Sequence, residues 1–300
     1  MIYIAELHNL EEGDAARPLQ ISESSPEIIK LVRLFSGTTQ LVMSAEGQED
    51  ETFFAGQNYI RPDQEITSGN LNIVAQYIFD EVPGQEELVD ILRRLRGKNH
   101  SFYRDLCGEF CLCLLSMGNN RFTEAFLFLY RSLERMSAAC PLIYSSRQND
   151  FRTAHKFLSG IYRDEKSPGE LGLLQAFLKE HARDNQDFAE ATLDIAVPNW
   201  GGSFASEFSR QWRDVVEREV PPASIDLDAG EIRCPYPNVA SLIVTVRNRS
   251  FHNLSGQKNL DLFRLKGSDP IFSVLMPHFL QWTAYVFLDF ARWQISSLRV

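Results

Sequence analysis

The sequence predicts a mainly α protein, in which a helical domain over residues 98–300 follows a small acidic α/β segment over residues 1–97. Three observations support this. Apolar residues recur with the 3.6-residue period of helices from about Ser68 onward. Short strand-like runs alternate with acidic turns before that point. Hydrophobic residues make up 44% and charged residues 23% of the 300, which is ordinary for a folded soluble protein. The boundary falls between Ser68 and Lys98.

The N-terminal segment contains three candidate strands and one candidate helix. Ile2–Leu7 alternates loosely between apolar and polar residues. Thr39–Met43 and Thr52–Phe54 flank the turn-rich stretch Glu46–Asp50, so we expect a hairpin there. Pro26–Phe35 has the apolar spacing of a helix.

The rest of the chain reads as a succession of helices. Periodic apolar residues predict them over residues 71–78, 88–95, 106–114, 122–137, 171–178, 204–215, 239–254 and 270–296. Asn119 or Asn120 is a candidate cap for the helix from Phe122, which we expect to end at Cys140-Pro141. Ser167–Glu170 has the pattern of a capping box. The β-branched run Val239–Val246 also permits a strand.

Charge is distributed unevenly along the chain. The net charge of −10 argues against a protein that coats nucleic acid along its whole surface. Residues 1–90, however, carry 17 acidic and four basic side chains, whereas residues 231–300 carry four acidic and eight basic ones. The C-terminal quarter is therefore the net-basic part of an acidic chain.

Cysteine usage and the termini bear on the compartment. The five cysteines have no disulfide-framework spacing, and the N-terminus lacks the pattern of a signal peptide, so we expect a reduced, cytoplasmic protein. Ile271–Phe290 has 14 apolar residues in 20, but it contains Pro277, His278 and Asp289. We therefore expect a buried core or interface helix, in which Phe272, Leu275, Phe279, Trp282, Val286 and Trp293 are covered, and no membrane association.

Several common catalytic motifs are missing. Gly97-Lys98-Asn99 lacks the Ser or Thr and the upstream glycine of a phosphate loop. Gly201–Ala205 departs from the nucleophile elbow at its last residue, and Ser203 suits a helix cap better. Cys107 and Cys111 fall on one apolar helix face, which favours core packing over metal binding. We expect neither a metal nor another cofactor.

Arg247-Asn248-Arg249-Ser250-Phe251-His252 is the remaining candidate site. Histidine exchanges protons near neutral pH, and arginine offers parallel donors to a phosphate. Asn248 lies one helical turn before His252 and is placed to orient its ring. Arg247 lies about 140° around the helix from His252, so it needs its full length or a break in the helix to reach the same phosphate. This chemistry suits metal-free cleavage of RNA.

Spacing alone does not identify such a site. With 23 arginines and six histidines, an Arg and a His separated by four to six residues are expected about 1.4 times by chance. The chain has three such pairs: Arg247/His252, and His100 with both Arg93 and Arg94. Arg94 lies in the basic last turn of a predicted helix, before Gly97, so we expect a structural role for that pair.

Arg247-Asn248-x-x-x-His252 resembles the signature of the HEPN superfamily, in which an Arg precedes a His by four to six residues, often with a polar residue after the Arg. Phe126–Arg135 resembles an early helix of bacterial HEPN proteins, and the likeness covers roughly residues 100–300. The resemblance implies a helical bundle that dimerises so that two motifs line one cleft. It also implies a metal-independent RNase that leaves a 2′,3′-cyclic phosphate and a 5′-hydroxyl.

By their positions in the motif, the resemblance implies that Arg247 and His252 are catalytic and that Asn248 has a supporting role in the site. Arg249 and Arg131 are candidate substrate-binding residues, although the stretch around Arg131 also reads as a surface ion-pair network. Leu254 stands where some toxin members have a modified tyrosine, so the resemblance does not extend to that form of control.

The expected function is endoribonuclease action on RNA by a homodimer, in antiphage defence or a toxin system, with a regulatory protein as a further partner. The alternative is an inactive HEPN-like dimerisation or binding module in a larger complex.

Overall fold

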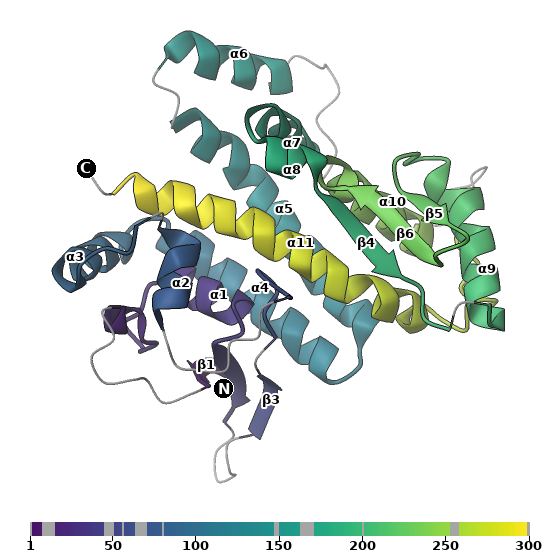
Figure 1. The fold of residues 1–300 in the computed structure, drawn as a ribbon, viewed down its shortest axis with the longest axis horizontal. Helices are drawn as coiled ribbons and strands as arrows, with labels where there is room; N and C mark the ends of the chain where they lie inside the picture. The colour runs from purple at the N-terminus through teal and green to yellow at the C-terminus, as the bar shows by residue number, and fades with distance from the viewer. Residues whose placement is uncertain are drawn as a thin grey trace. The chain divides into compact units, whose positions relative to one another are not determined.

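The structure is a computed structural model of a mainly helical protein (Figure 1). It describes residues 2–7, 16–44, 51–55, 57–63, 71–79, 81–146, 150–162, 171–199, 201–252 and 258–298. The chain forms two compact units. The first unit comprises Met1–Asn120 with Thr283–Val300, and the second unit comprises Arg121–Trp282. This division differs from the expected boundary at residue 97, because the first unit extends further along the chain and also takes its C-terminal end.

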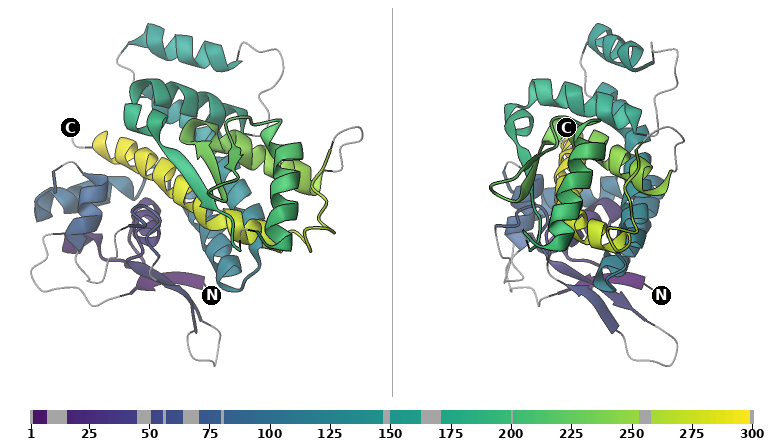
Figure 2. Two further views of the ribbon diagram at one scale, coloured as in Figure 1. Left: turned by 45° about the vertical axis from the view of Figure 1, so that its right-hand side comes forward. Right: turned by 90° about the vertical axis from the view of Figure 1, so that its right-hand side faces the viewer.

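The first unit combines one small sheet with five complete helices and the end of another. Its elements are β1 (Ile2–Glu6), the 3-10 helix η1 (Arg17–Leu19), α1 (Glu27–Phe35), β2 (Thr39–Met43), β3 (Glu51–Ala55), α2 (Leu71–Ile78), α3 (Gln85–Leu95), α4 (His100–Gly118) and the C-terminal part of α11 (Asp269–Ser296). The strands are antiparallel in the order β1-β2-β3, seen as purple to blue arrows in Figure 2. The expected strands and hairpin pairing are confirmed, whereas the expected turn at 46–50 lies outside the described residues.

Arg33 on α1 joins the parts of the first unit. Its side chain is almost fully buried and forms an ion pair with Glu6 of β1. The same guanidinium donates to the main-chain oxygen of Leu19 at 2.9 Å and to Oγ1 of Thr38 at 2.7 Å. A buried charge is tolerated only when it is paired and hydrogen-bonded, and here strand, loop and helix all contribute partners.

Gly37 allows the chain to turn directly after α1. Its φ of +74° belongs to the left-handed region, and a Cβ placed there would lie 2.7 Å from the main-chain carbon of Gln57. No other residue type fits this close approach without movement of the backbone. The turn brings β2 back antiparallel to β1, from Ile2 opposite Met43 to Glu6 opposite Thr39.

The second unit is built mainly of helices and carries a second small sheet. Its elements are α5 (Phe122–Ser146), α6 (Phe151–Tyr162), α7 (Gly172–Asp184), α8 (Gln186–Glu190), β4 (Thr192–Ala196), α9 (Ser203–Gln211), the π-helix η2 (Trp212–Glu217), β5 (Ser224–Asp226), β6 (Glu231–Pro235), the 3-10 helix η3 (Tyr236–Asn238), α10 (Val239–Phe251) and the N-terminal part of α11. Most of the expected helices are present. The expected capping box at 167–170 lies outside the described residues.

The sheet of the second unit was not predicted. Its antiparallel strands have the order β4-β6-β5 (Figure 1), and they are only three to five residues long. Burial alternates along β4, with Leu193 and Ile195 inside. Val239–Val246, for which a strand was the alternative, is helical within α10.

α5 differs from its predicted form at both ends. Asp269 accepts hydrogen bonds from the main-chain nitrogen and Oγ1 of Thr123, at 2.7 and 2.8 Å, so Asp269 rather than an asparagine satisfies this end of the helix. The helix also continues past Pro141 to Ser146. Pro141 is buried, and packing of the helix therefore outweighs the one main-chain hydrogen bond that a proline removes.

A second capping expectation is wrong. Ser203 is the first residue of α9 rather than its cap, and Gly202 occupies the cap position without a side-chain hydrogen bond. The helix then widens into η2, where Trp212 is buried and its indole nitrogen donates to the main-chain oxygen of Ala223 at 2.9 Å.

α11 is long and apolar enough to cross a membrane by length and composition, but 72% of its most apolar window is buried. That burial fits a core helix. Of the residues expected to be covered, five are buried and Trp293 is partly exposed; the five are Phe272, Leu275, Phe279, Trp282 and Val286.

Candidate active site

α10 positions the predicted site in the second unit. Its apolar residues face the core, with Leu242, Ile243 and Val246 fully buried. The helix ends at Phe251, and His252 follows in an extended conformation with φ −101° and ψ 111°. The end of the helix therefore supplies the break that Arg247 needs in order to reach His252.

Arg247 and His252 are in direct contact. Nη1 of Arg247 lies 2.5 Å from Nε2 of His252. A guanidinium can only donate hydrogen bonds, so Nε2 must present its lone pair and the imidazole proton lies on Nδ1. His252 is exposed and Arg247 partly so. The arrangement therefore offers an unprotonated imidazole nitrogen beside a permanent positive charge, at a position that a ligand can reach.

Asn248 orients the arginine rather than the imidazole. Its Oδ1 accepts from Nη1 of Arg247 at 3.0 Å, while its main-chain oxygen accepts from the nitrogen of His252, also at 3.0 Å. The prediction that the Asn248 side chain positions the ring is not supported. Its side chain fixes one member of the pair and its main chain fixes the other.

Tyr130 of α5 is a site residue that sequence reasoning missed. Its ring is almost fully buried, and the guanidinium carbon of Arg247 lies 5.0 Å from the ring centroid. A cation over an aromatic face is held by attraction to the ring. We call Tyr130, Arg247, Asn248 and His252 the Arg–His cluster. Tyr130 is 117 residues before Arg247 in the chain, so only packing of α5 against α10 could reveal it.

The two candidate substrate-binding arginines have different environments. Arg249 is buried and forms an ion pair with Glu219, which does not support the expectation that it binds substrate. Its charge is used within the fold. Arg131 is exposed, and its guanidinium carbon lies 5.9 Å from the centroid of the Phe128 ring. It directly follows Tyr130 in the chain.

A hollow of about 270 Å³ lies beside the Arg–His cluster. It is lined by Arg249–His252 on one side and Asn259–Leu262 on the other. His252 therefore contacts Arg247 and also borders an open space. Leu254, the position at which some HEPN toxins have a modified tyrosine, lies outside the described residues.

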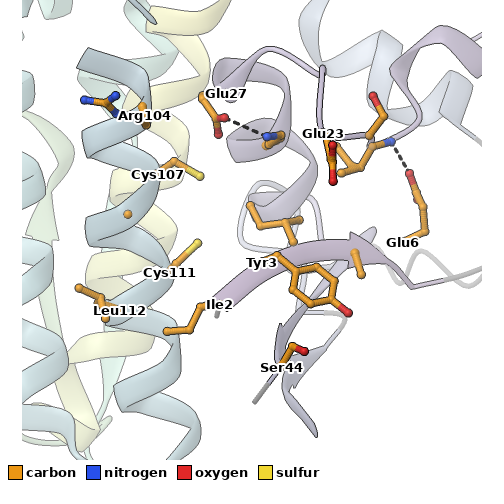
Figure 3. Close-up of a pocket in the computed structure, with 16 residues that line it drawn as sticks. Ile2, Tyr3, Glu6, Glu23, Glu27, Ser44, Arg104, Cys107, Cys111 and Leu112 are labelled. Carbon is orange, nitrogen blue, oxygen red and sulfur yellow. Dashed lines mark hydrogen bonds and ion pairs between the residues drawn. The ribbon is translucent and has the colours of Figure 1, made fainter. Parts of the chain in front are cut away.

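The first unit contains a larger cavity of about 940 Å³, which sequence reasoning also missed (Figure 3). β1 and α4 both line it. Cys107 and Cys111 project from α4 toward this cavity, so Cys111 is only partly buried and does not belong to the packed core. Three of the charged groups at its wall are engaged locally: Lys30 pairs with Glu27 at 2.8 Å, and Glu6 accepts from the main-chain nitrogen of Ile21 at 2.6 Å.

The Cys107 thiol at this cavity is weakly acidic. A hydrogen bond with Cys111, burial and the nearby Glu27 carboxylate together hold the pKa of Cys107 well above its usual range. Cys107 is therefore a protonated thiol at neutral pH, and only the thiolate is a good nucleophile or metal ligand. Within the described parts of the chain, no group of three or more His, Cys, Asp or Glu side chains is arranged to hold a metal ion.

The comparisons with known proteins give no family. No protein-family model matches the chain, and neither a curated protein nor a solved structure is significantly similar to it. The geometry of the Arg–His cluster is therefore the basis for a function.

Proposed function

We propose that this protein is a metal-independent endoribonuclease with a HEPN-like helical domain, and that the Arg–His cluster is its active site. The observation that carries the proposal is the contact between Nη1 of Arg247 and Nε2 of His252, at an exposed position. The two groups differ in role because one is always cationic and the other can take up a proton.

The reaction begins at the ribose 2′-hydroxyl. Nε2 of His252 accepts the 2′ proton, and O2′ attacks the adjacent phosphorus. A bond forms between O2′ and phosphorus while the bond from phosphorus to O5′ breaks. The leaving 5′ oxygen takes a proton from solvent, and the imidazolium returns its proton to solvent. The products are a 2′,3′-cyclic phosphate and a 5′-hydroxyl, and no water is consumed.

Arg247 stabilises the charge that develops on the non-bridging phosphate oxygens. Its guanidinium carries parallel donors that suit two oxygens of one phosphate. When a phosphate binds there, it competes with His252 for Nη1 and leaves Nε2 available to the 2′-hydroxyl. Asn248 and Tyr130 hold the guanidinium from two sides while this exchange takes place. Because the arginine supplies the positive charge, the step needs no metal ion.

The proposal includes a homodimer in the cytoplasm that acts in antiphage defence or as a toxin, under the control of a partner protein. In a dimer, the imidazoles of two clusters can act as base and acid at one phosphate, and this removes the need for solvent to protonate the leaving oxygen. Light scattering at micromolar concentration tests this assembly, and a monomer would contradict it. For the toxin role, expression of the wild type should slow growth, and Arg247→Ala should relieve the effect.

RNA cleavage in excess EDTA tests the nuclease itself. We expect His252→Ala to lower the cleavage rate by at least 100-fold, the smaller end of what general-base groups contribute. His100→Ala is the matched control, because His100 is also an exposed histidine but starts α4 in the first unit. Equal cleavage by both variants, or cleavage only with added metal, would contradict the mechanism, whereas no cleavage by the wild type would favour a dimerisation or binding module.

A further inference from the structure

Phe251 belongs to a cluster of three aromatic rings in the second unit, with Phe126 and Phe272. It lies parallel to Phe272, with ring centroids 5.7 Å apart and an interplanar angle of 6°. Phe272 in turn stacks on Phe126 at 4.2 Å. Phe272 and Phe126 are fully buried, whereas Phe251 is 38% exposed. The Phe251 ring is therefore anchored against two core rings and also meets solvent.

This exposed ring is adjacent to the proposed base. Phe251 and His252 are consecutive residues, and both line the 270 Å³ hollow. That volume lies just below the range of pockets that enclose a whole small ligand, so it suits a single flat group rather than a nucleotide. Large aromatic side chains are usually covered, and an exposed one fixed against a rigid core is a suitable surface for a planar ligand.

We propose that Phe251 positions RNA by stacking with the base of a nucleotide next to the cleaved bond, with the base in the hollow beside His252. This inference rests on the proposed function, and it names the substrate class as single-stranded RNA. A base in a duplex is stacked between its neighbours and is not available to the ring, whereas an unpaired base can be turned out.

Stacking on Phe251 fixes where the RNA binds, but it does not select an RNA sequence. Every base has an aromatic face, so the ring accepts all four. Once the base is held at Phe251, the sugar that carries it is kept close to His252, and the adjoining phosphate is kept close to Arg247. The ring itself touches no reacting atom, so Phe251 is a positioning residue.

Cleavage of a single-stranded RNA octamer that carries one abasic nucleotide at successive positions tests the inference. With the wild type, we expect an abasic nucleotide next to the cleaved bond to raise KM about tenfold, in the range of one base–aromatic stack, and to change kcat less. Phe251→Ala should raise KM by a similar factor on the intact RNA and should make the abasic substitution there silent. Phe251→Trp should restore the wild-type pattern.

Two further variants separate stacking from folding. Phe251→Leu keeps apolar packing on Phe272 but has no aromatic face, and it should behave like Phe251→Ala. Phe263→Ala is the matched control, because Phe263 is 94% exposed and does not line the hollow. An unchanged KM in Phe251→Leu, or an abasic penalty that persists in it, would overturn the inference.

Binding of the same RNA to His252→Ala distinguishes failure of this inference from failure of the proposed function. If the RNA binds tightly and binding depends on Phe251, but the wild type does not cleave it, the role of the ring is supported and the nuclease is rejected. Cleavage that depends on His252 but is indifferent to Phe251 rejects the ring's role alone. Binding and cleavage that are both absent reject both.

Discussion

Arg247/His252 in the second unit and Arg94/His100 in the first unit have similar spacing in the sequence and different environments. In the second unit, Arg247 and His252 lie at the end of one helix, with Nη1 and Nε2 in contact. In the first unit, Arg94 belongs to the last turn of α3, while His100 begins α4. Asn99, in the left-handed conformation with φ 52°, lies in the turn between these helices.

The two arginines also have different partners. Arg94 forms an ion pair with Asp90 and donates to the main-chain oxygen of Leu298 at 3.1 Å, so it ties α3 to the C-terminal end of the chain. Arg247 lies over an aromatic ring and beside an amide and an imidazole. Spacing in sequence does not decide whether such a pair can act on a ligand. The position of the helix end and the partners of the arginine decide it.

The largest expected effect is on cleavage. Arg247→Ala should lower the rate of RNA cleavage by about 100-fold or more, the usual loss when one donor to a developing oxyanion is removed. Arg94→Ala should leave the rate within about twofold, because Arg94 is used in structure. Initial rates of both variants in EDTA measure the contrast. A similar loss in Arg94→Ala would remove the functional difference between the pairs.

A smaller effect is expected from the Tyr130 ring that lies against Arg247. Tyr130→Leu removes the aromatic face under Arg247 and should weaken RNA binding by about 2- to 30-fold, the range of one cation–π interaction. Tyr130→Phe keeps the face and should bind within about twofold of the wild type. Equilibrium binding to labelled RNA measures both. Equal losses in the two variants would assign the effect to the hydroxyl instead of the ring.

The smallest expected effect is on stability, where Arg94→Ala should cost more than Arg247→Ala. Arg94→Ala removes an ion pair and a hydrogen bond that are partly exposed, and it should cost about 1 kcal/mol, or about 2 °C in the melting temperature. Arg247→Ala should lower the melting temperature by less than Arg94→Ala, because the contacts with Asn248 and Tyr130 that it removes are not ion pairs. Arg93→Ala is the control, because Arg93 shares the partner Asp90 but is 71% exposed. If thermal unfolding shows equal shifts for Arg93 and Arg94, the bond to Leu298 contributes nothing.

Local patterns predicted much of the fold. The predicted face of α5 is buried at Ala125, Phe126, Leu129, Leu133 and Met136 and only partly buried at Phe122. The hairpin of β2 and β3 also forms in the expected place. The second sheet was missed because strands of three to five residues leave little alternation to detect. The end of α5 was misplaced because a proline signal was outweighed by packing.

The site shows the same limit. The contact of Arg247 with His252 could be predicted because both groups belong to one short segment, although the way it forms depends on where α10 ends. The roles of Tyr130 and Glu219 could not be predicted, because tertiary packing brings each of them to its arginine from another part of the chain. Such partners decide whether an arginine can bind substrate or stabilises the fold, and a local sequence pattern does not reveal them.

The division of α11 between the two units has a consequence for synthesis on the ribosome. The first unit needs residues from Thr283 onward, including Phe287, whose ring lies 5.6 Å from that of Phe35, and Arg292, which donates to the main-chain oxygen of Tyr77. At 5–20 residues per second, the nascent chain waits roughly 10–40 s after residue 120 before these groups are made. The first unit is thus completed after the second, and its apolar surfaces stay open to chaperones until residues 283–300 have been made.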